Sequence, residues 1–274
     1  MFNFPERDNI TTVHISLFSH FRYLIYLPIT TFILIVFFTT PSSALASQVA
    51  IVIDDMGYRH SDQEALTLPG NVTYAFLPQT TYAKSLAVQA NNNNHDVLIH
   101  IPMESQHRNR LGPGALTSSM NEQAFKQSLA KSFAEFPFAI GINNHMGSYL
   151  TELYKPMSWT MDFLQKNNLL FLDSKTSPNS QAKQAALDYG VPVKTRHVFL
   201  DNKLTKTYIK KQFNQLMSVS KKHHNAIGIA HPHPETVAAL MKLIPTLKEH
   251  GIELVPLSSL YPQQTTVNLS LVTD

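Results

Sequence analysis

The sequence V-A-I-V-I-D-D-M-G at residues 49–57 decides the fold. Five apolar residues, most of them β-branched, run without interruption into two carboxylates and a glycine. Such a run is typical of a strand that is buried on both faces in a parallel sheet. Asp54 and Asp55 follow at the carboxyl end of this strand, where α/β folds carry their functional side chains. The stretch therefore predicts an α/β fold with a functional site at this strand end.

Two adjacent carboxylates at the mouth of an apolar strand repel each other unless a cation or a proton relieves them. We therefore expect a metal site, in which one Asp is a ligand and its neighbour is a general base. The alternative is that one Asp caps the next helix while the other is solvated.

The composition sets limits on the class of protein. The 274-residue chain has a net charge of +3, is 43% hydrophobic and contains no cysteine. These values fit a globular protein, and the length suits one α/β domain. The basic residues are scattered along the chain, so its charge gives no argument for nucleic acid as a partner. Without cysteine, disulfides, thiolate metal sites and cysteine nucleophiles are excluded. The sequence does not specify an oligomeric state.

The N-terminal segment predicts export. Residues 23–38 are strongly apolar, follow Arg22 and precede small residues at Ala44 and Ala46. This order is typical of a secretory signal peptide, here cleaved after Ala46, and we expect a periplasmic protein. The alternative is an uncleaved membrane anchor, but Pro28 leaves an uninterrupted stretch that is short for a span of about 20 residues. Contact with the membrane is expected only through this segment.

The rest of the chain alternates between apolar strands and helical segments. Three parts are predicted: a signal peptide at 1–46, one domain at 47–261 and a polar, frayed tail at 262–274. Strands are expected at 49–57, 71–78, 96–104, 139–148, 169–173, 192–201, 226–230 and 252–257. Helices are expected at 60–68, at 82–91, from a capping box at 119–122 to about 136, from 155 onward, at 180–189, at 205–224 and from 234 to 250.

This alternation predicts a parallel sheet with helical crossovers, either closed into a barrel or open and doubly wound. An open sheet gathers its site at one switch point, whereas a barrel brings every strand end to one mouth. We therefore predict a distorted (β/α)7-8 barrel in a single domain. The polar side chains at six strand ends are Asp54 with Asp55, His100, His145, Asp173, Asp201 and His231.

Asp and His side chains from different strands are typical of a site for zinc or a similar divalent ion with an open coordination position. Such an ion activates water and polarises a carbonyl, while a carboxylate takes the proton of the water and a histidine protonates the departing amine. His145 precedes Met-Gly, where the backbone turns sharply, which favours a role in the site. His100 lies inside an apolar run, where a lone histidine is more often a core residue. His231 and His233 flank a proline, and either one could instead cap the next helix.

Four segments, V-A-I-V-I-D-D-M-G, L-I-H-I-P-M-E, G-I-N-N-H-M-G-S and A-H-P-H-P-E-T, occur in this order along the chain. Together they resemble the divergent polysaccharide deacetylase family, a branch of the NodB-homology carbohydrate esterases. The resemblance extends from about residue 49 to residue 261. It implies a distorted (β/α) barrel and the metal-dependent removal of an N- or O-acetyl group from a polysaccharide.

The resemblance also implies roles for individual residues. Asp54 resembles the catalytic base and Asp55 a metal ligand, while His231, or alternatively His233, resembles the acid. The superfamily's second motif has two histidines four residues apart, and here His145 stands alone. The resemblance therefore implies three ligands for a divalent ion, expected to be zinc: Asp55, His100 and His145. Further candidates for substrate binding or for support of the ligands are Asn144, Glu104, Asp173 and Asp201. We find no Arg-containing substrate motif of the superfamily.

These observations predict an exported, metal-dependent deacetylase that acts on an acetylated amino-sugar polymer, either peptidoglycan or another polysaccharide. A second hypothesis is a catalytically inactive periplasmic protein on the same barrel, which binds a glycan or assists envelope assembly. A third is a metal-dependent hydrolase of another bond, such as an amide in peptidoglycan. We expect the long loop at 105–118 to contribute to substrate specificity.

Overall fold

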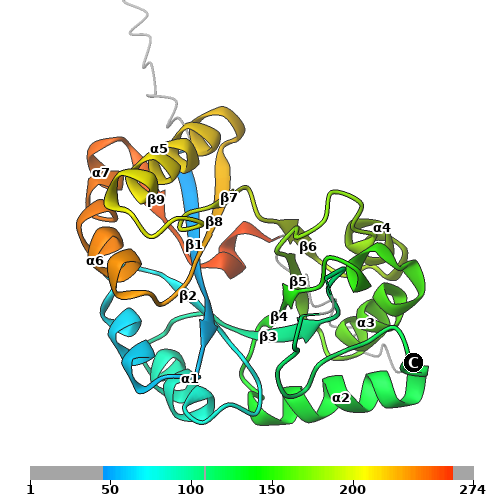
Figure 1. Ribbon diagram of the computed structural model, residues 1–274. Coiled ribbons are helices and arrows are strands. Elements are labelled where there is room, and N and C mark those ends of the chain that lie inside the picture. Colours follow the sequence, from blue (N-terminus) through cyan, green and yellow to red (C-terminus); the bar gives the residue numbers. More distant parts are fainter. Residues whose placement is uncertain (1–45, 108, 262–274) are drawn as a thin grey trace, which may run out of the picture. The chain divides into compact units, whose positions relative to one another are not determined.

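The computed structural model describes residues 46–107 and 109–261 (Figure 1). The predicted signal peptide, apart from its last residue, and the predicted C-terminal tail lie outside these residues. Parallel strands form one curled sheet, and helices cover its convex side. The strands are β1 (Ser47–Met56), β2 (Thr73–Phe76), β3 (Val97–Met103), β4 (Gly141–Met146), β5 (Leu170–Asp173), β6 (Val193–Thr195), β7 (Val198–Phe199), β8 (Asn225–Ala230) and β9 (Ile252–Leu254).

Helices α2 and α5 begin at residues whose side chains accept a hydrogen bond from a free N–H group of the first turn. The Asn121 side chain accepts from the Ala124 N–H at 2.9 Å, and the Thr205 hydroxyl accepts from the Tyr208 N–H at 3.3 Å. Within the described ranges, no helix has the length and apolar character needed to cross a bilayer. The α-helices are α1 (Ala83–Asn92), α2 (Glu122–Glu135), α3 (Tyr154–Lys166), α4 (Ala182–Tyr189), α5 (Lys206–His223), α6 (Pro234–Leu243) and α7 (Thr246–Glu249). Shorter 3-10 segments are η1 (His60–Thr67), η2 (Leu150–Glu152) and η3 (Leu257–Leu260).

Strand β1 is the centre of the sheet. The strand order is β6-β5-β4-β3-β2-β1-β8-β7, and β9 also pairs with β1. One edge of β1 pairs with β8, while its other edge pairs first with β9 and then with β2. All of these pairings are parallel, as helical crossovers require. The predicted fold class, a distorted single-domain barrel with a parallel sheet, is confirmed.

The predicted strand at 192–201 is wrong in one respect, because it is two strands. Strands β6 and β7 lie at the two edges of the sheet, and only Arg196 and His197 separate them in the chain. The Arg196 N–H donates to the carbonyl of Asp173, whereas the His197 N–H donates to the carbonyl of Ile227 on β8. The chain thus crosses the gap between the sheet edges within two residues. Because the backbone stays extended while its partner strand changes, hydrophobic periodicity does not reveal the break.

The sheet separates two layers of apolar packing. On β1, Val49, Ile51 and Ile53 belong to the cluster under the helices, while Ala50 and Val52 belong to the cluster inside the curl. This division follows from the alternation of side chains along a strand. The interior is therefore packed with apolar side chains up to the point where β1 reaches its two carboxylates.

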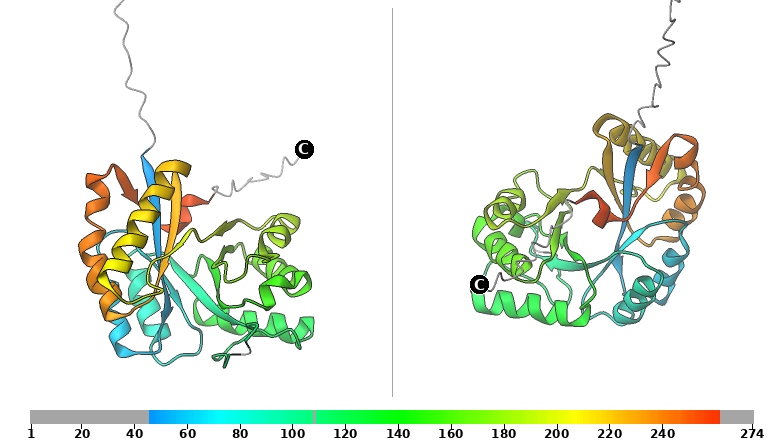
Figure 2. Two further views of the ribbon diagram at one scale, coloured as in Figure 1. Left: turned by 45° about the horizontal axis from the view of Figure 1, so that its top comes forward. Right: turned by 180° about the vertical axis from the view of Figure 1, so that it is seen from behind.

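Segment η3 fills the concave side of the sheet, as Figures 1 and 2 show. Leu257, Leu260 and Tyr261 join the interior cluster, and the Tyr261 hydroxyl donates to the carbonyl of Phe171 at 3.0 Å. The Ser258 N–H donates to the Asp96 carboxylate at 2.7 Å, which fixes the segment at its amino end. Because η3 occupies the interior, the carboxyl ends of the strands are left for the functional site.

Truncating the segment inside the curl should destabilise the protein. Leu257 is fully buried, so Leu257→Ala should lower the free energy of unfolding by about 2–5 kcal/mol in urea denaturation. Leu187→Ala is the matched control, because this leucine is 64% exposed on α4, and its effect should stay within about 0.5 kcal/mol. Equal losses in the two variants would contradict a structural role for η3.

Candidate metal centre

Asp54 and Asp55 reach the same site because β1 is irregular at its end. Consecutive residues of a regular strand point to opposite faces. Here the register between β1 and β2 shifts between Ile53 and Met56, and Asp55 has a left-handed φ of 59°. Asp tolerates this conformation better than most residues do. As a result, His100 Nε2 lies 3.7 Å from Asp54 Oδ2 and 3.1 Å from Asp55 Oδ1.

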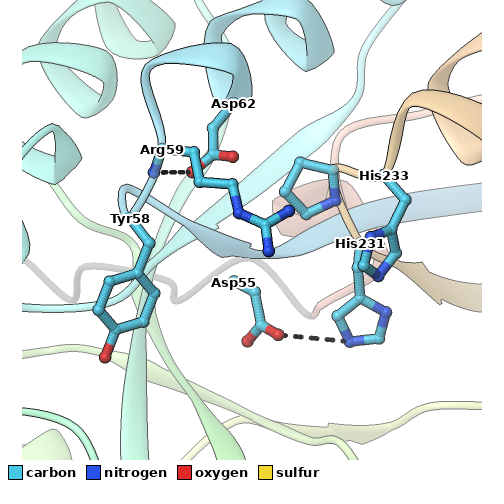
Figure 3. A pocket seen from close by; sticks show the side chains of 7 residues that line it. Asp55, Tyr58, Arg59, Asp62, His231 and His233 are labelled. Carbon is cyan, nitrogen blue, oxygen red and sulfur yellow. Dashed lines mark hydrogen bonds and ion pairs between the residues drawn. The ribbon is translucent and has the colours of Figure 1, made fainter.

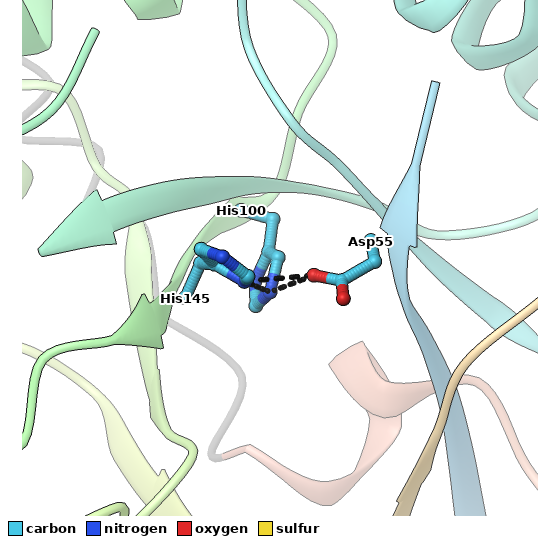
Figure 4. Close-up of side chains that lie close together, drawn as sticks. All are labelled: Asp55, His100 and His145. Carbon is cyan, nitrogen blue, oxygen red and sulfur yellow. Dashed lines mark hydrogen bonds and ion pairs between the residues drawn. The ribbon is translucent and has the colours of Figure 1, made fainter. Parts of the chain in front are cut away.

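Two neighbouring strands supply the imidazoles. His100 lies within β3, and His145 lies near the end of β4, opposite Pro102 in the strand register. Their facing nitrogens, His100 Nε2 and His145 Nδ1, are 3.2 Å apart, and His145 Nδ1 is 2.8 Å from Asp55 Oδ1 (Figure 4). One oxygen and two nitrogens therefore converge on a single point between β1, β3 and β4.

The chemistry of this cluster fits a divalent metal ion. Among the described residues, Asp55 Oδ1 is the buried side-chain polar atom that lacks a hydrogen-bond partner, although two imidazole nitrogens lie close to it. Burial alone raises the pKa of Asp55, but the imidazoles of His100 and His145 outweigh it and lower this pKa below its ordinary value. An ionised carboxylate with two imidazoles is a donor set that zinc and similar ions accept with a position left open.

Asn143 connects the carboxylate of Asp54 to the imidazole of His100. Its Nδ2 donates to Asp54 Oδ1 at 2.8 Å, and its Oδ1 accepts from His100 Nδ1 at 2.9 Å, which leaves His100 Nε2 facing the carboxylates. A partner of this kind fixes the orientation of a histidine ligand. Burial raises the pKa of Asp54, which brings this carboxyl closer to the range of a general base.

The sequence analysis missed Asn143 and named Asn144. Asn144 Oδ1 accepts from the Ser174 N–H at 2.9 Å, and its Nδ2 donates to the carbonyl of Met146 at 2.7 Å. It therefore supports the backbone next to His145 and the loop after β5. The strand alternation was a usable signal, because Asn143 shares a face of β4 with His145 whereas Asn144 does not.

His231 approaches the cluster from the end of β8, with Asp201 behind it. His231 Nε2 lies 3.9 Å from Asp55 Oδ2, and His231 Nδ1 lies 3.0 Å from Asp201 Oδ1. Asp201 Oδ2 also accepts from the His231 N–H and from the Thr236 hydroxyl. Burial lowers the pKa of His231, but the Asp201 carboxylate outweighs this effect and raises the pKa to about 9. The imidazole is therefore protonated at neutral pH, as an acid must be.

His233 lies beside His231, with ring centroids 6.1 Å apart, at the residue before α6. Asp201, His231 and His233 form a second group whose possible ligand atoms lie within 4.8 Å of one another. The Asp201 carboxylate already accepts bonds from His231 and Thr236. The first cluster, with its orphaned oxygen on Asp55, is therefore the better candidate for the ion.

Asp173 and Glu104 bind backbone groups of loops. Asp173 Oδ1 accepts from the Lys175 N–H at 2.7 Å, and burial raises the pKa of this carboxyl. Glu104 Oε2 accepts from the Ser118 N–H at 2.7 Å, which attaches the end of the 105–118 loop to β3. Both carboxylates therefore fix loops that follow the carboxyl ends of strands.

Arg196, which the sequence analysis did not single out, lies at the crossing between the sheet edges. Its guanidinium stacks on Phe199 at 3.7 Å and donates to the carbonyls of Ser174 and Lys175. Burial lowers the pKa of Arg196, while the negative charges of Asp173 and Asp54 oppose this change. No short motif marks it in the sequence, because it follows the β-strand pattern of its neighbours.

A pocket of about 190 Å³ opens beside the cluster (Figure 3). It lies between the turn after β1 and the turn after β8. Its lining residues are Asp55, Tyr58, Arg59, Asp62, His231, Pro232 and His233.

The fold and the cluster define an α/β barrel with a carboxylate–imidazole site at the carboxyl ends of its strands. Residues 51–261 match the family described as divergent polysaccharide deacetylase, and the chain belongs to that family.

Its relatives include proteins without an assigned activity. The chain is 39% identical over 220 residues to the uncharacterized protein YibQ of Escherichia coli, a match that covers 80% of this chain and 69% of YibQ. It is 34% identical over 229 residues to an uncharacterized protein of Haemophilus influenzae, with 83% and 81% covered. A crystal structure of an uncharacterized protein from Agrobacterium tumefaciens is similar with a TM-score of 0.76 at 27% identity, covering 80% of this chain and 91% of that one.

Removing the charge behind His231 should lower its pKa. In Asp201→Asn the anion is lost while a hydrogen-bond acceptor remains, so the pKa of His231 should fall from about 9 toward its ordinary value of 6.5. NMR titration of the imidazole resonances in metal-free protein measures this change. Asp188→Asn, an exposed position on α4, is the control. An unchanged pKa in Asp201→Asn would show that Asp201 does not hold the proton on His231.

Proposed function

We propose that this protein is an exported, metal-dependent deacetylase that removes acetyl groups from an amino-sugar polymer of the cell envelope. The observation that carries the proposal is the convergence of Asp55, His100 and His145 on one point, with Asp54 and His231 next to it. The family membership supports a polysaccharide as the substrate. The predicted signal peptide supports export and, with it, an envelope polymer such as peptidoglycan.

Asp55, His100 and His145 would hold the ion, and zinc is the proposed identity because of the carboxylate and imidazole donors. When bound, such an ion supplies Lewis-acid activation of water and of the acetyl carbonyl. Asn143 keeps His100 Nε2 turned toward this point, and the left-handed backbone of Asp55 keeps its carboxylate there.

Asp54 is the proposed base. Its Oδ1 is held by Asn143, and its Oδ2 faces His100, so the carboxylate is positioned by residues of two other strands. In hydrolysis, Asp54 takes one proton from water as the oxygen attacks the acetyl carbon. Burial favours the protonated form of this carboxyl, which assists the transfer.

His231 is the proposed acid. Its protonated imidazole donates a proton to the amide nitrogen as the carbon–nitrogen bond breaks, and the products are the free amine and acetate. Asp201 holds the ring by Nδ1, so that Nε2 faces the cluster. The proposed base thus lies on β1 and the proposed acid directly follows β8, at the same mouth.

Two departures from the superfamily motivate the second hypothesis, a glycan-binding protein without catalysis: the lone histidine of the G-I-N-N-H-M-G-S segment and the missing Arg-containing substrate motif. The G-I-N-N-H-M-G-S segment contains only one histidine, but β3 supplies a second imidazole. His100 Nε2 lies 3.2 Å from His145 Nδ1, which supports the enzyme instead.

The Asp54→Asn variant separates catalysis from metal binding. Acetate release from N-acetylated glycans should fall about 10²- to 10⁴-fold because the base is lost, whereas zinc content should be retained because Asp55, His100 and His145 are intact. Enzymatic detection of acetate, beside elemental analysis of the same samples, measures the two properties. Asp188→Asn should leave both unchanged.

Undiminished acetate release in Asp54→Asn would remove Asp54 from the mechanism. If the zinc-loaded wild-type protein binds acetylated glycans and releases no acetate from any of them, the catalytic proposal is wrong and the binding hypothesis is favoured.

A further inference from the structure

The pocket beside Asp55 contains a cation that the proposed chemistry does not use. Figure 3 shows the Arg59 guanidinium extended across this pocket, between Asp62 and His233 and above Asp55. Among the residues that the structure describes, no carboxylate forms an ion pair with it. By contrast, the Arg196 guanidinium donates to the carbonyls of Ser174 and Lys175. Arg59 is thus an available cation at the edge of the candidate metal centre.

The nearest carboxylate on the same turn, Asp62, is directed at the backbone. Its Oδ2 accepts from the Gly57 N–H at 2.9 Å and from the Arg59 N–H at 3.0 Å, and the residue is only 2% exposed. These two bonds fix the turn that carries Arg59. Gly57 has a φ of +117°, and a Cβ on it would lie 2.6 Å from that of Ala83, so the turn is also packed closely against α1.

Three further side chains of the pocket can donate hydrogen bonds to an anion, whereas the Asp55 and Asp62 carboxylates that also line it cannot. These donors are the imidazoles of His231 and His233 and the Tyr58 hydroxyl. The Tyr58 hydroxyl also approaches Gly112, where an added Cβ would lie 2.6 Å from that oxygen. The pocket therefore adjoins the 105–118 loop that is expected to contribute to specificity.

We propose that this pocket binds a carboxylate carried by the substrate, so that the preferred glycan is an acetylated amino sugar with an acidic substituent. The inference rests on the proposed function and names its substrate class. A guanidinium binds a planar carboxylate through two parallel hydrogen bonds, which gives geometric selectivity as well as charge neutralisation. Because Asp55 lines the same pocket, the acidic group belongs to the sugar that carries the scissile acetyl group or to its direct neighbour.

The test compares one glycan in two forms. The probes are a peptidoglycan-derived glycan of N-acetylglucosamine and N-acetylmuramic acid with free carboxylates, and the same glycan as its methyl ester. Calorimetric titration gives the Kd of each form for the zinc-loaded protein, and acetate release gives kcat and KM. Wild type should favour the free acid by about 10- to 100-fold in Kd, the range of a hydrogen-bonded charge pair.

In Arg59→Gln, the ratio of the Kd of the ester to the Kd of the free acid should fall close to one, while the Kd of the ester itself stays unchanged. Arg59→Lys should keep a smaller preference, because it retains the charge without the planar fork. Lys84→Gln, an exposed position on α1, is the matched control and should behave as wild type. The preference of wild type should also weaken as salt is added.

Equal binding of the two forms by wild type, or an undiminished preference in Arg59→Gln, would overturn the inference. So would weaker inhibition by acetate in Arg59→Gln with an unchanged preference, because the pocket would then bind the product. The binding titration needs no turnover, so failure of the proposed function, seen as no acetate release from either form, is distinguishable from failure of this inference.

Discussion

The site depends on the close approach of two consecutive carboxylates to one buried imidazole. Asp54 and His100 are each only 2% exposed, and Asp55 Oδ1 is buried although the rest of its side chain reaches solvent. Two adjacent negative charges at the end of an apolar barrel are costly without a compensating positive charge. Burial lowers the pKa of His100, but the two carboxylates outweigh burial and raise it. A divalent ion bound by these residues would supply the compensating positive charge, and its binding would be coupled to the protonation of its ligands.

The apolar interior of the barrel surrounds these charged groups and increases the cost of leaving them uncompensated. Inward positions are apolar at Val52, Leu98 and Ile229, and the next inward positions along the same strands are Asp54, His100 and His231. Along each of these strands, the inward side chains thus change from packed apolar groups to ionisable groups within two residues. Segment η3 fills the interior on the other side, where Leu257 and Leu260 pack and the Tyr261 hydroxyl donates to the carbonyl of Phe171.

Much of this architecture is predictable because it depends on local pattern. The apolar run before Asp54 predicts β1, and the polar residues at successive strand ends predict a shared mouth, which holds for Asp55, His100, His145 and His231. The divided strand around Arg196 is not predictable, because an extended chain that changes partners has the same periodicity as one that does not. The role proposed for Arg59 is also not predictable from the sequence, because it depends on which carboxylates lie near the guanidinium in space. The contact of Asn143, rather than Asn144, with the site lies between these cases, because predicting it requires only the side-chain alternation along one strand.

We propose that Asp55, His100 and His145 bind one divalent ion. The most direct measurement is a crystal structure of the zinc-reconstituted protein with anomalous data collected at the zinc absorption edge. We expect one strong anomalous peak in contact with Asp55 Oδ1, His100 Nε2 and His145 Nδ1. A peak at Asp201, His231 and His233 instead, or no peak between β1, β3 and β4, would contradict it.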